Sequence, residues 1–131
     1  KNSILKTHPK EFERLAGRQK NHYLRLKRQQ ELAENLEVII ILKGAHTSIC
    51  LPEGKCVFNT TGNPGMATGG SGDVLTGMLL GLLAQNYSPE DAAILGVYLH
   101  GAAGDRAAEE KGEQSMIAGD IIDHIRPETK Q

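Results

Sequence analysis

One continuous apolar run, Val38-Ile39-Ile40-Ile41-Leu42, constrains the fold of this chain more than any other feature of its sequence. Branched side chains at successive positions, with no polar residue at every second place, indicate a β-strand that is buried on both faces. Such strands are typical of parallel sheets whose faces are covered by helices. The run therefore predicts an α/β fold.

The segments on either side of this strand alternate as an α/β fold requires. Asn21 to Asn35 is rich in helix formers, which predicts a helix. Thr47 to Leu51 and Cys56 to Thr60 resemble two short strands, and the turn sequence Pro52-Glu53-Gly54-Lys55 joins them. We therefore expect a helix before the buried strand and a β-hairpin after it.

The second half of the chain predicts helices. Apolar residues recur at helical spacing from about Gly72 to Gln85. Ser88 and Pro89 form a strong helix start, an N-cap followed by proline at the first helical position, and this helix extends to roughly Lys111. Isoleucines between Ile117 and Ile125 predict a last amphipathic helix.

Composition limits the partners of the protein. The 131 residues include 15 basic and 16 acidic side chains, a net charge of -1, so we expect neither nucleic acid nor a membrane as a partner. Cys50 and Cys56 have no further cysteine or histidine at metal-ligand spacing. We expect both cysteines to be reduced, in a cytoplasmic protein.

The segment with the clearest chemical meaning precedes the helix at 72–85 and includes five glycines in the twelve residues from Thr61 to Gly72. Glycines allow backbone N–H groups to turn inward, and a helix start adds partial positive charge. We therefore expect an anion hole at Gly69 to Gly72. The segment matches neither G-x-x-x-x-G-K-[ST] nor G-x-G-x-x-G, so neither a P-loop nor a Rossmann site is indicated.

Asp73 directly follows this anion hole. A carboxylate beside a bound phosphate repels it unless the carboxylate has a role in the reaction. One interpretation is a general base that takes the proton of a substrate hydroxyl as its oxygen attacks a phosphoryl group. The other is a first-turn acid that the helix dipole favours.

These residues carry a family resemblance. The sequence from Thr61 to Gly77 resembles the signature of the NAD(P)H-hydrate dehydratases, which belong to the ribokinase-like superfamily. The similarity extends to Leu42–Thr47, His100–Asp105 and Thr7–Phe12. It implies a three-layer αβα domain with a mainly parallel sheet. Residues 1–131 are then the C-terminal part of one catalytic domain, without its N-terminal part, and the complete domain is roughly twice as long.

The resemblance also implies a reaction and its site. ADP or ATP, with Mg2+, phosphorylates the hydroxyl of hydrated NADH or NADPH, and phosphate then leaves to restore the dihydronicotinamide. Asp73 is the base and contacts the hydrate, while Gly70, Ser71 and Gly72 form the anion hole. Gly72 also contacts the nucleotide. The adenine-nucleotide segment comprises Lys43, Gly44, Ala45, His46 and Thr47.

The same resemblance adds two candidate site residues near the N-terminal end of the sequence. His8 corresponds to the histidine that contacts the hydrate. Glu11 is expected to help hold magnesium through water, although it also suits the first turn of a helix from Glu11 to Leu15. The family commonly has Thr-Pro before the histidine, whereas this chain has Lys6-Thr7.

Several interpretations remain open at this point. Lys43 would neutralise nucleotide charge or reach solvent at a strand end, and His46 is expected in an exposed loop. His100 and Asp105 are expected to have structural roles. Other possible functions are a ribokinase-like kinase of a sugar or vitamin precursor, or a non-catalytic nucleotide-binding fragment. We expect a homo-oligomer.

Overall fold

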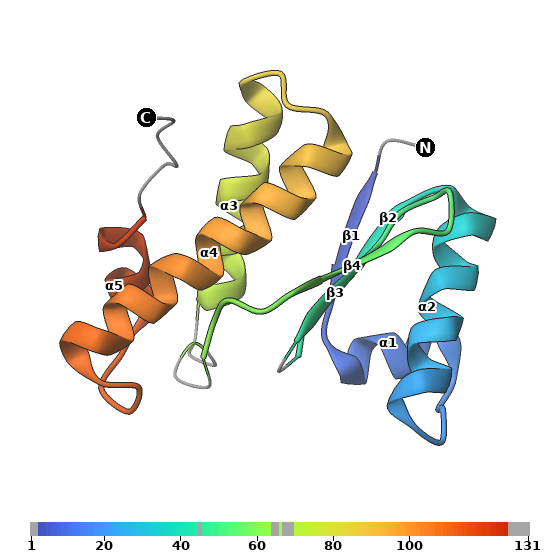
Figure 1. Ribbon diagram of the computed structural model, residues 1–131, viewed down its shortest axis with the longest axis horizontal. Helices are drawn as coiled ribbons and strands as arrows, with labels where there is room; N and C mark the ends of the chain where they lie inside the picture. The colour runs from blue at the N-terminus through green and yellow to red at the C-terminus, as the bar shows by residue number, and fades with distance from the viewer. Residues whose placement is uncertain (1–2, 45, 64–65, 67–69, 126–131) are drawn as a thin grey trace.

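A computed structural model describes residues 3–44, 46–63, 66 and 70–125 and arranges them in three layers (Figure 1). Helices α1 and α2 cover one face of a four-stranded sheet, α3 and α4 cover the other, and α5 packs on the outer end of α4. The elements are β1 (Ile4–Thr7), α1 (Pro9–Ala16), α2 (His22–Leu36), β2 (Ile39–Leu42), β3 (Thr47–Cys50), β4 (Cys56–Asn59), α3 (Ser71–Ala84), α4 (Pro89–Lys111) and α5 (Ala118–Asp123).

The sheet has the order β1-β2-β3-β4 and is mixed. Strand β1 pairs parallel with β2, whereas β2 with β3 and β3 with β4 are antiparallel. The α/β fold is confirmed, but the expectation of a mainly parallel sheet is wrong for the described strands. The reason is the length of the connections: those at 43–46 and 51–55 are too short for the crossover that a parallel pair of strands needs.

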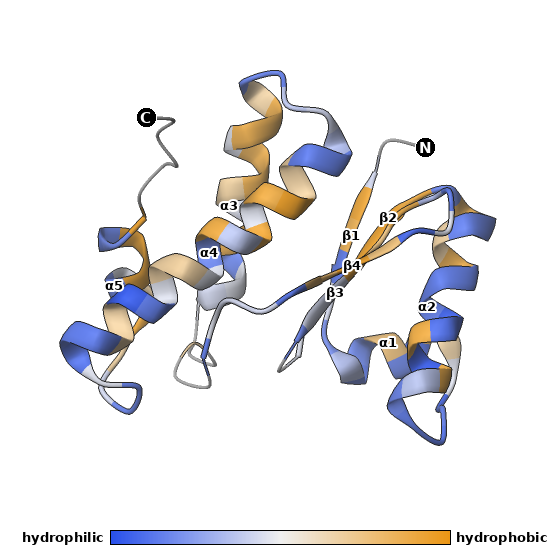
Figure 2. Cartoon of the chain, viewed as in Figure 1, coloured by the Kyte–Doolittle hydropathy of each residue, from blue (hydrophilic) through white to orange (hydrophobic). Residues whose placement is uncertain are grey.

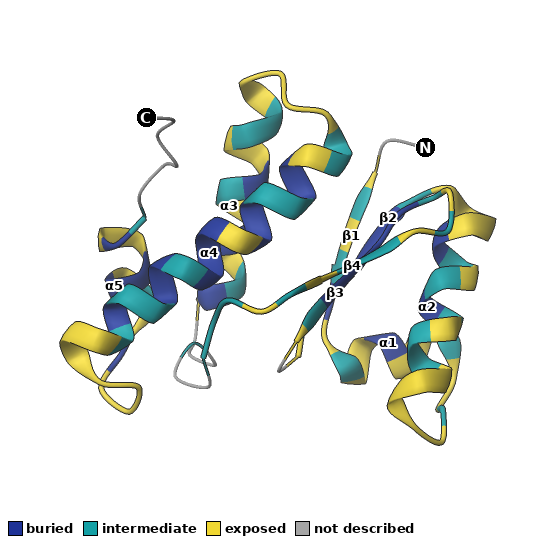
Figure 3. Ribbon diagram, viewed as in Figure 1, coloured by how far each residue is buried: buried dark blue, intermediate teal, exposed yellow. Residues whose placement is uncertain are grey.

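Strand β2 is the centre of the core, as its sequence predicts. All four of its residues are buried (Figure 3). Ile39 and Ile41 pack toward α3 and α4, in a cluster that includes Leu75 and Val97. Ile40 faces the opposite way, toward α2. Figure 2 shows apolar residues along most of β1 and β2 and over much of α3.

A buried polar contact joins α2 to the sheet. The Gln29 side chain is fully buried, and its Nε2 donates to the Ile40 carbonyl at 2.8 Å and to the Ser48 carbonyl at 3.2 Å. The Ser48 hydroxyl donates back to Gln29 Oε1 at 2.8 Å. All the polar groups of this buried amide therefore have a partner from the sheet.

The helix boundaries in the second half follow the prediction closely. Ser88 caps α4, with its Oγ accepting the Asp91 N–H at 3.1 Å, and α4 ends at Lys111. Helix α5 is shorter than the predicted range 117–125. Within the described ranges, no helix combines the length and apolarity that crossing a bilayer requires.

The two cysteines differ from expectation. Cys50 and Cys56 form a disulfide across the β3–β4 hairpin, so the prediction of reduced thiols is wrong in this structure. The physical reason is the antiparallel register, which places the two residues directly opposite each other. Spacing in the sequence could not indicate this without the register.

Candidate functional site

The glycine-rich segment leads into α3 through a backbone conformation that suits glycine. Gly70 is the N-cap of α3 and has φ 88°, in the left-handed region. Its carbonyl accepts the Val74 N–H at 3.1 Å, so the helix is regular from its first turn. The N–H groups of Ser71, Gly72 and Asp73 therefore lie at a helix start, where they lack intrahelical acceptors and can bind an anion.

A carboxylate on α4 anchors the start of the same segment. Asp105 Oδ2 accepts the backbone N–H of Gly62 at 3.0 Å, and Oδ1 accepts Asn63 Nδ2 at 2.9 Å. The predicted structural role of Asp105 is confirmed. Its partners were not predicted, because they lie 42 and 43 residues away along the chain.

Helix α4 also lies very close to the backbone at Thr61. The Thr61 hydroxyl donates to the Tyr98 carbonyl at 3.1 Å. A Cβ on Gly101 would lie 2.7 Å from the Thr61 carbonyl carbon, closer than Cβ atoms come to other heavy atoms in proteins. Glycine at position 101 therefore allows the loop to rest directly on α4.

His100 lies beneath the first turn of α3. It is only 5% exposed, and its Nε2 lies 3.0 Å from the Ser71 carbonyl oxygen, which makes Nε2 the protonated nitrogen. Burial lowers the pKa of His100 to about 4, and the positive charges of Lys43 and Lys6 contribute. The imidazole is thus a neutral packing residue that joins α4 to α3, as predicted.

Two lysines from neighbouring strands face this helix start. Lys6 on β1 donates from Nζ to the Gly72 carbonyl at 3.0 Å. Lys43, just after β2, is half-buried, and its backbone N–H donates to the Thr7 carbonyl at 3.0 Å. Burial and the nearby Lys6 lower the pKa of Lys43. Lys43 is therefore partly shielded from solvent, and its role in nucleotide binding stays a prediction.

The remaining nucleotide-segment candidates lie in and after the β2–β3 connection. Gly44 and His46 are exposed, as expected for His46, and Ala45 lies outside the described residues, as does Gly69 of the anion hole. Thr47 is half-buried and pairs with Asn59 across the hairpin. This connection thus approaches the start of the glycine-rich segment.

The candidates at the N-terminal end have a clear local role. His8 is the exposed N-cap of α1, and its backbone N–H donates to Glu11 Oε1 at 3.0 Å. Glu11 is thus a first-turn acid, the alternative interpretation. Among the described residues, no group of three or more His, Cys, Asp or Glu side chains is arranged to hold a metal ion. A water-mediated contact of Glu11 with magnesium stays a prediction.

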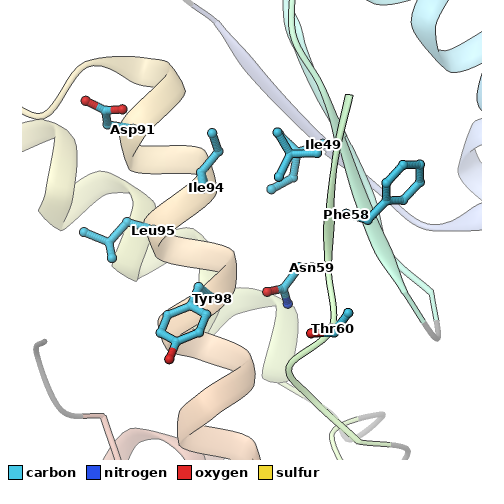
Figure 4. A pocket seen from close by; sticks show the side chains of 9 residues that line it. Ile49, Phe58, Asn59, Thr60, Asp91, Ile94, Leu95 and Tyr98 are labelled. Carbon is cyan, nitrogen blue, oxygen red and sulfur yellow. The ribbon is translucent and has the colours of Figure 1, made fainter. Parts of the chain in front are cut away.

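Asp73 is exposed in the first turn of α3, next to Gly72. A separate groove of about 390 Å³ lies between β4 and α4 (Figure 4). Ile94 and Tyr98 of α4 line one side, and Asn59 and Thr60 line the other. The residues that line this groove do not include Ser71, Gly72 or Asp73.

Solved structures define the class of protein. A ribokinase-like superfamily protein from Enterococcus faecalis has a TM-score of 0.68 and 33% identity, over 95% of this chain and 45% of that one. The ADP/ATP-dependent NAD(P)H-hydrate dehydratase from Bacillus subtilis, co-crystallized with ATP/Mg2+, has a TM-score of 0.85 and 40% identity, over 93% of this chain and 45% of that one. The fold is therefore ribokinase-like.

The family follows from the sequence. The family model described as NAD(P)H-hydrate dehydratase matches residues 1–127, and the chain belongs to this family. A bifunctional NAD(P)H-hydrate repair enzyme from Moorella thermoacetica is 48% identical over 93% of the chain and 23% of its own length. The ADP-dependent (S)-NAD(P)H-hydrate dehydratase of Bacillus subtilis is 42% identical over 92% of the chain and 44% of its own length. The chain thus spans less than half the length of these relatives.

Proposed function

We propose that the complete protein repairs hydrated NADH or NADPH, using ADP or ATP as phosphoryl donor. The observation that carries this proposal is the start of α3, where a left-handed Gly70 opens an anion-binding helix turn and Asp73 stands beside it, in a chain of this family. The related Bacillus subtilis enzyme is named as an ADP-dependent (S)-NAD(P)H-hydrate dehydratase. Residues 1–131 supply the C-terminal part of the catalytic domain.

The proposed reaction has two steps. The hydrate hydroxyl oxygen attacks the terminal phosphorus of the nucleotide, the bond from that phosphorus to the bridging oxygen breaks, and Asp73 takes the hydroxyl proton. The ring nitrogen lone pair then expels phosphate, and the neighbouring carbon loses a proton to restore the double bond. Phosphate leaves far more readily than hydroxide, which explains why a kinase-like fold suits a dehydration.

The nucleotide is held at the C-terminal end of β2 and the start of α3. The N–H groups of Ser71 and Gly72 bind the transferred phosphate, as helix starts do. The segment from Lys43 to Thr47 binds the rest of the nucleotide, since Lys43, Gly44 and His46 line one pocket of about 660 Å³. Magnesium, when bound, would neutralise charge on the phosphates, and Glu11 would contact it through water.

The hydrate lies on the exposed side of Asp73. His8 contacts the hydrate and helps to orient its hydroxyl toward the phosphate, since its ring can donate or accept a hydrogen bond. We also propose that the protein works in the cytoplasm as a homo-oligomer. Cytoplasm is where its substrates and nucleotide donors would be available.

The substitution Asp73→Asn in the complete protein tests the proposal. Wild-type protein, given hydrated NADH with ADP or ATP, restores the absorbance of reduced nicotinamide and releases phosphate. The variant loses turnover by about 10²-fold or more but keeps nucleotide affinity, because the base is removed and the backbone N–H groups are not. Retained turnover would show that Asp73 is not the base. Accumulation of a phosphorylated alcohol by the wild type would indicate a kinase instead.

A further inference from the structure

We propose that Lys6 contacts the transferred phosphoryl group and strengthens the binding of the nucleotide's terminal phosphate. This inference rests on the proposed function, and it adds a residue to the site that the family resemblance does not supply.

The position of Lys6 follows from the sheet. Lys6 pairs with Ile41 in the parallel register, and Ile41 belongs to the cluster beneath α3 and α4. The Lys6 side chain thus leaves β1 on the α3 face, where Nζ reaches the Gly72 carbonyl at 3.0 Å. Nζ is also 3.0 Å from where a Cβ on Gly72 would be. The absence of a side chain at Gly72 is what leaves room for the ammonium group beside the helix start.

The ammonium group has bonding capacity left for a ligand. It carries three donors, and the Gly72 carbonyl takes one of them. A lysine side chain is a flexible four-carbon stem, so Nζ can leave the Gly72 carbonyl and reach toward an anion on the first-turn N–H groups. Lys6 is half-buried, so its ammonium group has already lost part of its hydration before it contacts a ligand.

Charge around the site supports the same assignment. Lys6 and Lys43 both approach a helix start that is itself partly positive. The lowered pKa of Lys43 reflects burial and the repulsion from Lys6. The ion pairs found among the described residues involve other side chains and leave these two lysines without a carboxylate partner. A bound polyphosphate would relieve this repulsion, which gives the two cations a common ligand.

Calorimetric titration of the complete protein with ATP, ADP and AMP tests the proposal. Lys6→Ala should raise the Kd for ATP and ADP about tenfold or more, as the loss of a charge-assisted contact does, and change the Kd for AMP less than twofold. Lys6→Arg should retain most of the affinity, and Lys6→Thr should behave like the alanine variant. Lys55→Ala is the matched control, because Lys55 is exposed in the turn at the far end of the β3–β4 hairpin.

Two outcomes separate this inference from the proposed function. If the wild type dehydrates the hydrate and Lys6→Ala binds ATP as well as the wild type does, the role of Lys6 is wrong and the proposed function stands. An equal loss of affinity for ATP and AMP would also overturn it, because the effect would then be structural. A wild type that binds no adenine nucleotide would overturn both.

Discussion

Asp105 on α4 accepts the backbone N–H of Gly62 at 3.0 Å, although the two residues are 43 positions apart in the sequence. The other carboxylate oxygen accepts Asn63 Nδ2. A single side chain on a rigid helix thus fixes where the glycine-rich segment begins. Since α3 begins where that segment ends, the geometry of the proposed phosphate site depends on α4 as well as on its own loop.

Removal of this carboxylate should cost both stability and function. We expect Asp105→Ala to lower the free energy of unfolding by about 1–3 kcal/mol, since two hydrogen bonds to a charged acceptor are lost. The Kd for ATP should rise as the loop loses its anchor. Urea unfolding and calorimetry measure the two effects. Asp123→Ala, which removes an exposed acid on α5, is the control and should change neither quantity.

The close approach of Thr61 to α4 predicts a strong effect of one methyl group. Gly101→Ala would place a Cβ 2.7 Å from the Thr61 carbonyl carbon, so the loop must move. We expect a destabilisation of roughly 1–3 kcal/mol, typical of overpacking. In Gly77→Ala, the new Cβ meets no atom within 4 Å, and higher helix propensity should stabilise the protein by about 0.5–1 kcal/mol. Similar stability changes in both variants would contradict the packing argument.

Stability should depend on pH through His100. Its folded-state pKa is about 4, compared with 6.5 for an unperturbed imidazole, so the unfolded chain binds more protons between these values. The free energy of unfolding should therefore fall as pH decreases from about 6.5 to about 4, by on the order of 3 kcal/mol, and His100→Gln should remove this part of the slope. An NMR titration of the His100 ring with a midpoint near 6.5 would refute the prediction.

The disulfide can be tested by direct thiol counting. We expect the protein, purified without reductant and denatured, to show no thiol from Cys50 or Cys56, and to gain two after reduction. Closure of so short a loop stabilises a protein by about 2 kcal/mol in the chain-entropy model, so Cys50→Ser with Cys56→Ser should lower stability by that order. Two reactive thiols before reduction would restore the prediction made from the sequence.

Long, strongly patterned elements could be predicted from the sequence, and short ones could not. Helix α4 was predicted with its cap and its end, and Ser88 and Pro89 are local signals for its start. Strand β1 was missed, since four residues with Lys6 among them carry no clear alternation. Its strand character depends on pairing with β2, which no local pattern reveals. The mixed sheet was missed for a related reason, because the buried run of β2 indicates coverage on both faces and not the direction of its neighbours.

In the candidate site, too, the features that local sequence carries could be predicted and those that depend on distant contacts could not. The anion hole and Asp73 lie in one stretch of sequence, so glycine spacing and helix-start chemistry identify them. The contributions of Lys6, His100 and Asp105 arise from contacts across 66, 29 and 43 residues. Contacts this distant depend on the tertiary fold. The only signal for Lys6 in the sequence was its departure from the common family pattern.

The buried amide of Gln29 favours one register between strands β2 and β3. Its two donors and its acceptor fit carbonyls and a hydroxyl on β2 and β3 in one alignment only. A slip of β3 by one residue would turn the Ser48 hydroxyl to the other face and leave the amide buried without it. Gln29 therefore favours the native register of β3 on β2 over a register shifted by one residue, and so helps to specify how the hairpin aligns with the rest of the sheet.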